Sequence, residues 1–247
     1  MMADTLQTLR STLDFFIKAC HGPKPTDGHD AQYWTMAGIH AFILNGLISI
    51  YEQAATIPEE KAVDFCGYAL QWTSATHHHH HVEETAYFPM FSHKFDTSFV
   101  EQEHSTFTPG LEALDSYLVS CLPTGAPYGL GEVAGEHEQQ KYDGSRVISI
   151  IDSFAEPLCK HLIQEVNSME PDKLRAAGLT EAEMQTIAQE SMKQSKKLPL
   201  TTIVVYSIML SPKEIDFPPF SSFLRYYVVP YVLAFPNRRW WQFAPKN

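Results

Sequence analysis

The sequence predicts an all-α protein: an up-and-down four-helix bundle with an N-terminal helix and an aromatic-rich C-terminal helical extension. Two observations predict this architecture. Apolar residues recur at spacings of three and four along four long segments, as they do on the buried face of a helix. Most links between these segments are short, which favours helices that run up and down beside one another.

The chain is expected to begin with a short helix, followed by a loop over residues 21–30 that holds two prolines and two glycines. The next segment, residues 30–55, is the first long helix of the predicted bundle. Each of these two helices has one apolar stripe. The stripes are Leu6, Leu9, Leu13 and Phe16 in the short helix, and Met36, Ile43, Leu47 and Tyr51 in the long one.

Pro58-Glu59-Glu60 indicates the start of the second long helix, because proline and acidic residues suit a first turn. This helix is expected to run to about Phe88, before Pro89. The third covers 96–122, with a kink predicted at Pro109-Gly110, where the apolar residues stay in phase. A long Pro- and Gly-rich loop, 122–142, leads to the fourth helix at 143–169.

The last third of the chain has a different composition. Thr180 and Glu183 form a capping box that opens a polar helix to about Lys196, and an apolar segment follows at 198–210. The tail after it is rich in aromatic residues and proline, so we expect it to pack on the bundle. Trp240-Trp241 and Tyr226-Tyr227 are interpreted as packing residues. The predicted division is a bundle over 1–175 and an extension over 176–247.

Composition limits the function. The 247 residues carry 18 Lys+Arg against 29 Asp+Glu, a net charge of −11, which argues against nucleic acid or anionic lipid as a partner. No uninterrupted apolar run is long enough for a membrane span, and the first residues do not resemble a secretory signal. We interpret the four cysteines as buried free thiols, and the expected location is cytoplasmic. The residues are Cys20, Cys66, Cys121 and Cys159.

Histidine is the unusual component, with 12 residues of which five form one run at 77–81. His79 and Glu83 lie four residues apart, and His161 and Glu165 repeat this spacing on another helix, so each pair shares a helix face. Two inward-pointing pairs of this kind suit a bundle that holds two metal ions, with bridging carboxylates and terminal imidazoles. His40 and His104 lie on the apolar faces of the other two helices.

The register within the histidine run has two alternatives. The face of His79 and Glu83 carries more apolar residues, so this pair is preferred, and His80 with Glu84 is the alternative pair or an outer support. His77, His78 and His81 are interpreted as a solvated face. Glu101 and Glu103 are expected to be solvated, although either could orient a ligand. His21, His29, His93 and His137 receive no role.

The sequence HHHHVEETAYFP resembles the HHxxEExxxFP signature of the hemerythrin-like (HHE cation-binding) domains. MAGIHAFILNGLISIY, EHSTFTPGLEALDSYL and KHLIQEV resemble the first, third and fourth helix motifs of that family, in the same order. The resemblance covers roughly residues 30–170. It implies a four-helix bundle with a non-haem diiron centre, with manganese as an alternative metal. The implied ligands are His40, His79, Glu83, His104, His161 and Glu165.

One position departs from the oxygen-carrying members of the family, which have a fifth histidine one turn after the third-helix ligand. Thr108 stands there in this chain. The resemblance and this open position lead to the expectation of a diiron protein that activates dioxygen, or a related small oxidant, to oxidise a small organic substrate. The alternative is a protein that binds or senses oxygen, nitric oxide or iron, or that takes part in iron-sulfur repair, without turnover.

Overall fold

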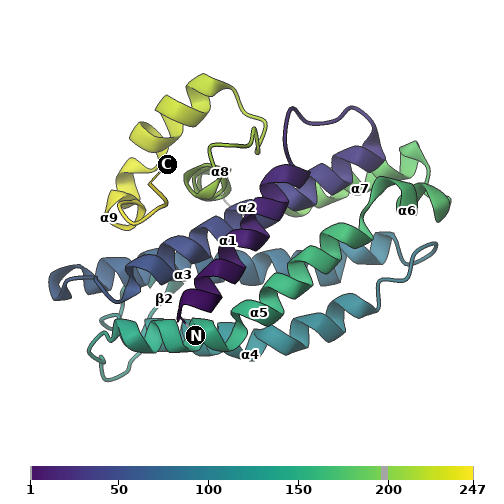
Figure 1. Cartoon of the computed structure of the whole chain (residues 1–247). Coiled ribbons are helices and arrows are strands. Elements are labelled where there is room, and N and C mark those ends of the chain that lie inside the picture. Colours follow the sequence, from purple (N-terminus) through teal and green to yellow (C-terminus); the bar gives the residue numbers. More distant parts are fainter. Residues whose placement is uncertain (1, 196–199, 247) are drawn as a thin grey trace.

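The computed structural model describes residues 2–195 and 200–246, and most of these residues are helical. The four longest helices of the described residues follow the N-terminal helix. They are α2 (Gly28–Ala54), α3 (Ala62–Val82), α4 (Phe99–Ser120) and α5 (Gly144–Ser168). α2 contacts α3 and α5, and α4 contacts α3 and α5, so the four helices surround a common core. Figure 1 shows them as long, roughly aligned helices.

Local sequence accounts for the helix starts. Asp27 precedes α2, and its side chain accepts hydrogen bonds from the backbone N–H groups of His29 and Asp30. Asp143 caps α5 in the same way through the N–H of Ser145. An N-cap carboxylate satisfies backbone donors that have no partner within the helix. These starts agree with the predicted segments to within about two residues, the usual uncertainty of helix boundaries.

The second long helix of the prediction differs in detail. It begins with a 3-10 turn, η1 (Glu59–Lys61), and α3 ends at Val82. The chain then continues through a π-helical turn, η2 (Glu83–Tyr87), and a second 3-10 turn, η3 (Phe88–Met90). The wider turn therefore begins at Glu83, one of the predicted metal ligands. π-turns within helices are rare and occur often at functional sites.

The remaining elements cover this core. α1 (Met2–Ala19) packs on α2 and α5, and the long loop holds a small antiparallel pair, β1 (Pro127–Tyr128) and β2 (Glu132–Val133). α6 (Pro171–Ala176) and α7 (Glu181–Ser195) contact α2. The Thr180–Glu183 capping box is confirmed, since the Thr180 N–H lies 2.7 Å from the Glu183 carboxylate. The predicted boundaries at Lys196 and residue 198 lie outside the described residues.

The C-terminal segments contact α2 and α3. They comprise α8 (Leu200–Leu210), the π-helix η4 (Leu224–Leu233), the 3-10 turn η5 (Phe235–Asn237) and α9 (Arg238–Trp241). Figure 1 shows these segments, in yellow-green and yellow, on one side of the long helices. Ser49 and Gln53 of α2 donate hydrogen bonds to the carbonyl of Phe243 at 2.6 and 2.8 Å.

The packing interpretation of the tail aromatics is half correct. Trp240 and Trp241 are buried, whereas Tyr226 and Tyr227 are 48% and 61% exposed. The predicted buried free thiols are confirmed for all four cysteines. By length and hydropathy alone α2 could cross a membrane, but 78% of its most apolar window is buried inside the protein. This burial is typical of a core helix.

Candidate metal centre

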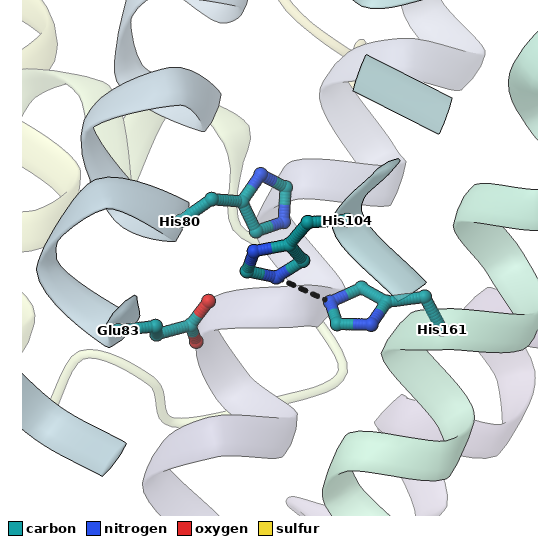
Figure 2. A group of neighbouring side chains, drawn as sticks. All are labelled: His80, Glu83, His104 and His161. Atoms are coloured by element: carbon teal, nitrogen blue, oxygen red, sulfur yellow. Dashed lines mark hydrogen bonds between the residues drawn. The ribbon is translucent and has the colours of Figure 1, made fainter. Parts of the chain in front are cut away.

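Two groups of buried side chains in the core could each hold a metal ion. The first contains His80, Glu83, His104 and His161, and Figure 2 shows these four side chains pointing toward one another. The second contains His40, His79, Glu83 and Glu165. Within each group, one ligand atom per residue lies within 4.8 Å of the others. Glu83 belongs to both groups, so the two candidate sites adjoin.

Helix geometry explains why Glu83 can serve both groups. Successive residues of an α-helix are separated by about 100° around its axis, so His79 and His80 face different directions. Glu83 then falls about 40° beyond His79 and about 60° short of His80. The carboxylate of Glu83 lies 2.9 Å from His79 Nε2. Consecutive histidines therefore supply separate sites, and the carboxylate between them is shared.

The other three helices each bring a histidine to these sites. His40 of α2 lies with its Nε2 atom 3.1 Å from the Glu165 carboxylate of α5. His161, one turn earlier on α5, lies 3.6 Å from the same oxygen atom. His104 of α4 has its Nε2 atom 3.1 Å from Nε2 of His161, the contact drawn in Figure 2.

Two outer carboxylates determine which ring nitrogens of the first group carry protons. His104 Nδ1 donates to Glu84 at 2.5 Å, and His161 Nδ1 donates to Glu103 at 3.1 Å. Both Nε2 atoms consequently present lone pairs to the interior of the site. Two lone pairs at 3.1 Å repel each other unless a cation lies between them. Two nitrogens bound to one ion at about 2.1 Å and at right angles would be about 3 Å apart, so the contact fits shared ligation.

The unpaired polar atoms of the second group also fit a metal. Nε2 of His40 and of His79 makes no hydrogen bond, and neither do the carboxylate oxygens of Glu83 and Glu165. Nε2 of His80 shares this property. Buried polar atoms without partners are costly, and buried carboxylates are tolerated when they pair with a cation or bind a metal. The described donors thus fit divalent ions with mixed nitrogen and oxygen ligation.

Burial controls the protonation of the ligands. It lowers the pKa of His79 to about 4 and that of His161 to about 3, so both imidazoles are neutral at pH 7. Burial, with the nearby Glu83 carboxylate, raises the pKa of Glu165 to about 8. Burial also raises the pKa of Glu83 well above its usual value. Neutral imidazole is the form that binds a metal, and a cation would release the carboxyl protons.

Aromatic side chains enclose the centre. The ring of Phe107 lies 5.0 Å from that of His80 and 5.2 Å from that of His161, and Phe16 lies edge-on to His40 at 5.3 Å. Tyr87, in the π-turn, is buried and donates a hydrogen bond to Gln32 at 2.9 Å. This lining keeps the ligands in an apolar environment.

Two surface hollows lie away from the ligands. One, of about 310 Å³, is between the start of α3, the loop 122–127 and the tail around Trp240. The other, of about 650 Å³, lies outside α3, where His77, His78 and His81 face the hairpin loop. Neither is lined by a residue of the two groups.

The structure brings together all six predicted ligands and changes two interpretations. The register does not divide into alternatives, because His79 and His80 each belong to one of the two candidate groups. Glu84 belongs to neither group and instead contacts His104 from outside. Glu103, which was expected to be solvated, contacts His161. Thr108 donates its hydroxyl to the His104 carbonyl.

Glu103 carries no distinctive signal in the sequence, because a glutamate beside a predicted ligand is common on exposed helix faces. The consecutive residues His79 and His80 do carry a signal. Two adjoining groups of donors need residues from more than one face of a helix, and consecutive residues lie on different faces. Comparison with family models, with curated proteins and with solved structures found no match to this chain.

Proposed function

We propose that the chain is a hemerythrin-like four-helix bundle, formed by α2, α3, α4 and α5, that holds two non-haem iron ions and binds a diatomic ligand. The observation that carries the proposal is the buried Glu83 carboxylate shared by two adjoining groups of histidine and glutamate. Every one of the four helical segments supplies donors, in the order that the resemblance implies. A bundle core is a common place for such dinuclear sites.

The donor set favours iron, with manganese as the alternative. Imidazole nitrogen with carboxylate oxygen suits iron or manganese, and four protein donors for each ion leave positions for other ligands. When bound, two ferrous ions would supply the electrons and the open position that dioxygen or nitric oxide requires. Glu84 and Glu103 would orient the imidazoles of His104 and His161 and raise their basicity.

His80 raises the number of candidate histidine donors to that of the oxygen-carrying members of the hemerythrin-like family. Thr108 stands where those proteins have a fifth histidine, and four histidines were expected here. The first group draws on His80 instead, so the two groups together offer five histidines and two glutamates. The number of nitrogen donors therefore supports a binding role more strongly than the sequence pattern does.

The surroundings of the ligands also support a small ligand over an organic substrate. Phe16 and Phe107 contact the imidazoles, and six of the seven donor residues are buried, which leaves little room for a large molecule beside them. Enzymes that transform organic molecules usually present a pocket of several hundred cubic ångströms next to the reacting centre. Binding or sensing of dioxygen or nitric oxide is thus favoured over oxidation of an organic substrate.

Metal analysis of single variants tests the assignment of the ligands. The untagged wild-type chain, loaded with ferrous iron without oxygen and then desalted, should retain two irons per chain. His79→Ala and His80→Ala should each retain about one, because each removes one ligand from a different group. His137→Ala, in the long loop, is the control and should retain two. Zinc alone in the wild-type protein, or full iron in both variants, would overturn the dinuclear assignment.

Gas titration of the loaded protein tests the role. The visible spectrum should change on exposure to dioxygen or nitric oxide, and should return when the gas is removed, without any added substrate. Sustained oxygen consumption that starts only when an organic compound is added would instead favour the oxidising role.

A further inference from the structure

A third group of potential ligands lies where the start of α2 meets the start of α7. Asp27 caps α2, His29 is in its first turn, and Glu181 is the first residue of α7. One nitrogen or oxygen atom from each residue lies within 4.8 Å of the others. None of these residues belongs to the two groups around Glu83, so this group is independent of the proposed diiron centre.

His29 is the buried member and determines what the group can bind. It is 6% exposed, and its Nε2 atom donates a hydrogen bond to the carbonyl of Leu179 at 2.8 Å. The proton therefore lies on Nε2, and Nδ1 carries a lone pair. Nδ1 is buried and makes no hydrogen bond. It faces Asp27 Oδ1 at 3.4 Å and Glu181 Oε2 at 3.7 Å, which are both acceptors.

The separations match ligands of one ion better than a hydrogen bond. A hydrogen bond between nitrogen and oxygen spans about 2.7–3.2 Å, and both distances exceed it. Two atoms bound at about 2.1 Å to one tetrahedral ion lie about 3.4 Å apart. The distances of 3.4 and 3.7 Å from Nδ1 are therefore those expected if an ion lay between the three side chains.

Other contacts hold the two carboxylates in place and leave them accessible. Glu181 accepts hydrogen bonds from the Gly28 N–H at 3.1 and 2.8 Å, and Asp27 accepts from two N–H groups of α2. The side chains of Asp27 and Glu181 are 45% and 44% exposed, so an ion can enter and water can complete its coordination. Arg175 lies 2.9 Å from Asp27 Oδ1 and competes with a cation for this oxygen.

We propose that Asp27, His29 and Glu181 form a mononuclear site for a divalent transition-metal ion such as Zn²⁺. One imidazole nitrogen with two carboxylate oxygens suits zinc and its neighbours, whereas calcium and magnesium prefer oxygen ligands alone. The ion joins the start of α2, the helix that carries His40, to the start of α7 in the C-terminal extension. Its role is structural, because a cation that binds only the folded chain stabilises it.

Zinc binding to the full-length chain tests the site. After iron loading, Zn²⁺ is titrated in competition with a chromophoric chelator, and the zinc bound per chain is counted. His29→Gln and Glu181→Gln should each bind one zinc ion fewer than wild type. Glu181→Gln keeps a carbonyl oxygen for the Gly28 N–H, so it separates loss of the ion from loss of this contact. Zinc should raise the Tm of wild type more than that of either variant.

His93→Gln is the matched control. His93 also contacts a carboxylate of α7, at 3.0 Å from Glu183, but among the described residues this is its single acidic partner within salt-bridge distance. This variant should bind as much zinc as wild type. Arg175→Gln should bind the same ion more tightly, because it removes the competing positive charge.

Wild-type zinc stoichiometry in both His29→Gln and Glu181→Gln would overturn the proposal, since zinc would then bind elsewhere, for example at His77, His78 and His81 of α3. The proposal would also be overturned if wild type bound no more zinc than these variants. Iron content near wild type in all variants would show that the two centres are separate.

Discussion

Replacing Glu165 with glutamine should stabilise the metal-free protein while weakening its metal binding. Glu165 is fully buried, and its pKa is raised from 4.5 to about 8 in the folded chain. The folded state therefore keeps a proton that the unfolded chain releases. The contribution of Glu165 to the free energy of unfolding is therefore most favourable below pH 4.5, the unfolded pKa. It becomes less favourable as the pH rises to about 8, the folded pKa.

The size of the effect follows from the two pKa values. At 1.36 kcal/mol per pKa unit, the native preference for the protonated carboxyl costs about 3 kcal/mol at pH 7 and about 4 kcal/mol at pH 8. Glutamine has nearly the same shape and never ionises, so Glu165→Gln removes this cost. The variant's advantage over wild type should grow by about 1 to 2 kcal/mol between pH 6.5 and 8 and then level off.

Urea unfolding of chelator-treated protein measures this difference. His79 and His161 are present in both proteins, so the pH dependence that their titration adds to the free energy of unfolding largely cancels in the difference. In the same variant, iron content should fall below two per chain, because the amide is a poor substitute for the Glu165 carboxylate of the second group. A metal-free variant no more stable than wild type, or a difference that is constant with pH, would refute the raised pKa of Glu165.

Two further predictions concern the outer contacts and the tail. Glu84→Gln should retain iron but bind it about 10- to 100-fold more weakly, because the amide orients His104 less strongly; competition with a chelator measures this, and unchanged affinity would contradict it. Gly67→Ala should lower the Tm, because an added Cβ at Gly67 would overlap the buried Trp240 ring of the tail. Trp240→Ala should suppress this added cost in the double variant, and additive losses would show that the clash lies elsewhere.

Helical periodicity predicted the long helices closely, because a helix with one buried face needs apolar residues at regular spacings of three and four. The capping box at Thr180 and Glu183 could also be predicted from the sequence, since its hydrogen bonds join residues only three apart. The π-turn at Glu83–Tyr87 was not, because it depends on which tertiary contacts the following residues make. The exposure of Tyr226 and Tyr227 also depends on how η4 lies on α8, and aromatic composition alone does not determine it.

The candidate ligands were found through the four-residue spacing of histidine and glutamate, which helix geometry enforces. Choosing between His79 and His80 by counting apolar neighbours assumed a single buried face. The centre instead spans two faces of α3, so both residues are inside it. Glu103 of α4 contacts His161 of α5, and residue spacing within a single helix cannot predict a contact between two helices.

The two outer carboxylates have a further consequence for charge balance. Glu83 and Glu165 within the groups and Glu84 and Glu103 behind His104 and His161 carry four negative charges when ionised. Two divalent ions would bring four positive charges to balance them; Glu83 and Glu165 are buried, where net charge is costly, whereas the Glu84 side chain is 37% exposed. With a single divalent ion, a proton kept by Glu83 or Glu165 would balance part of the remaining charge, so binding of a second ion should be accompanied by proton release.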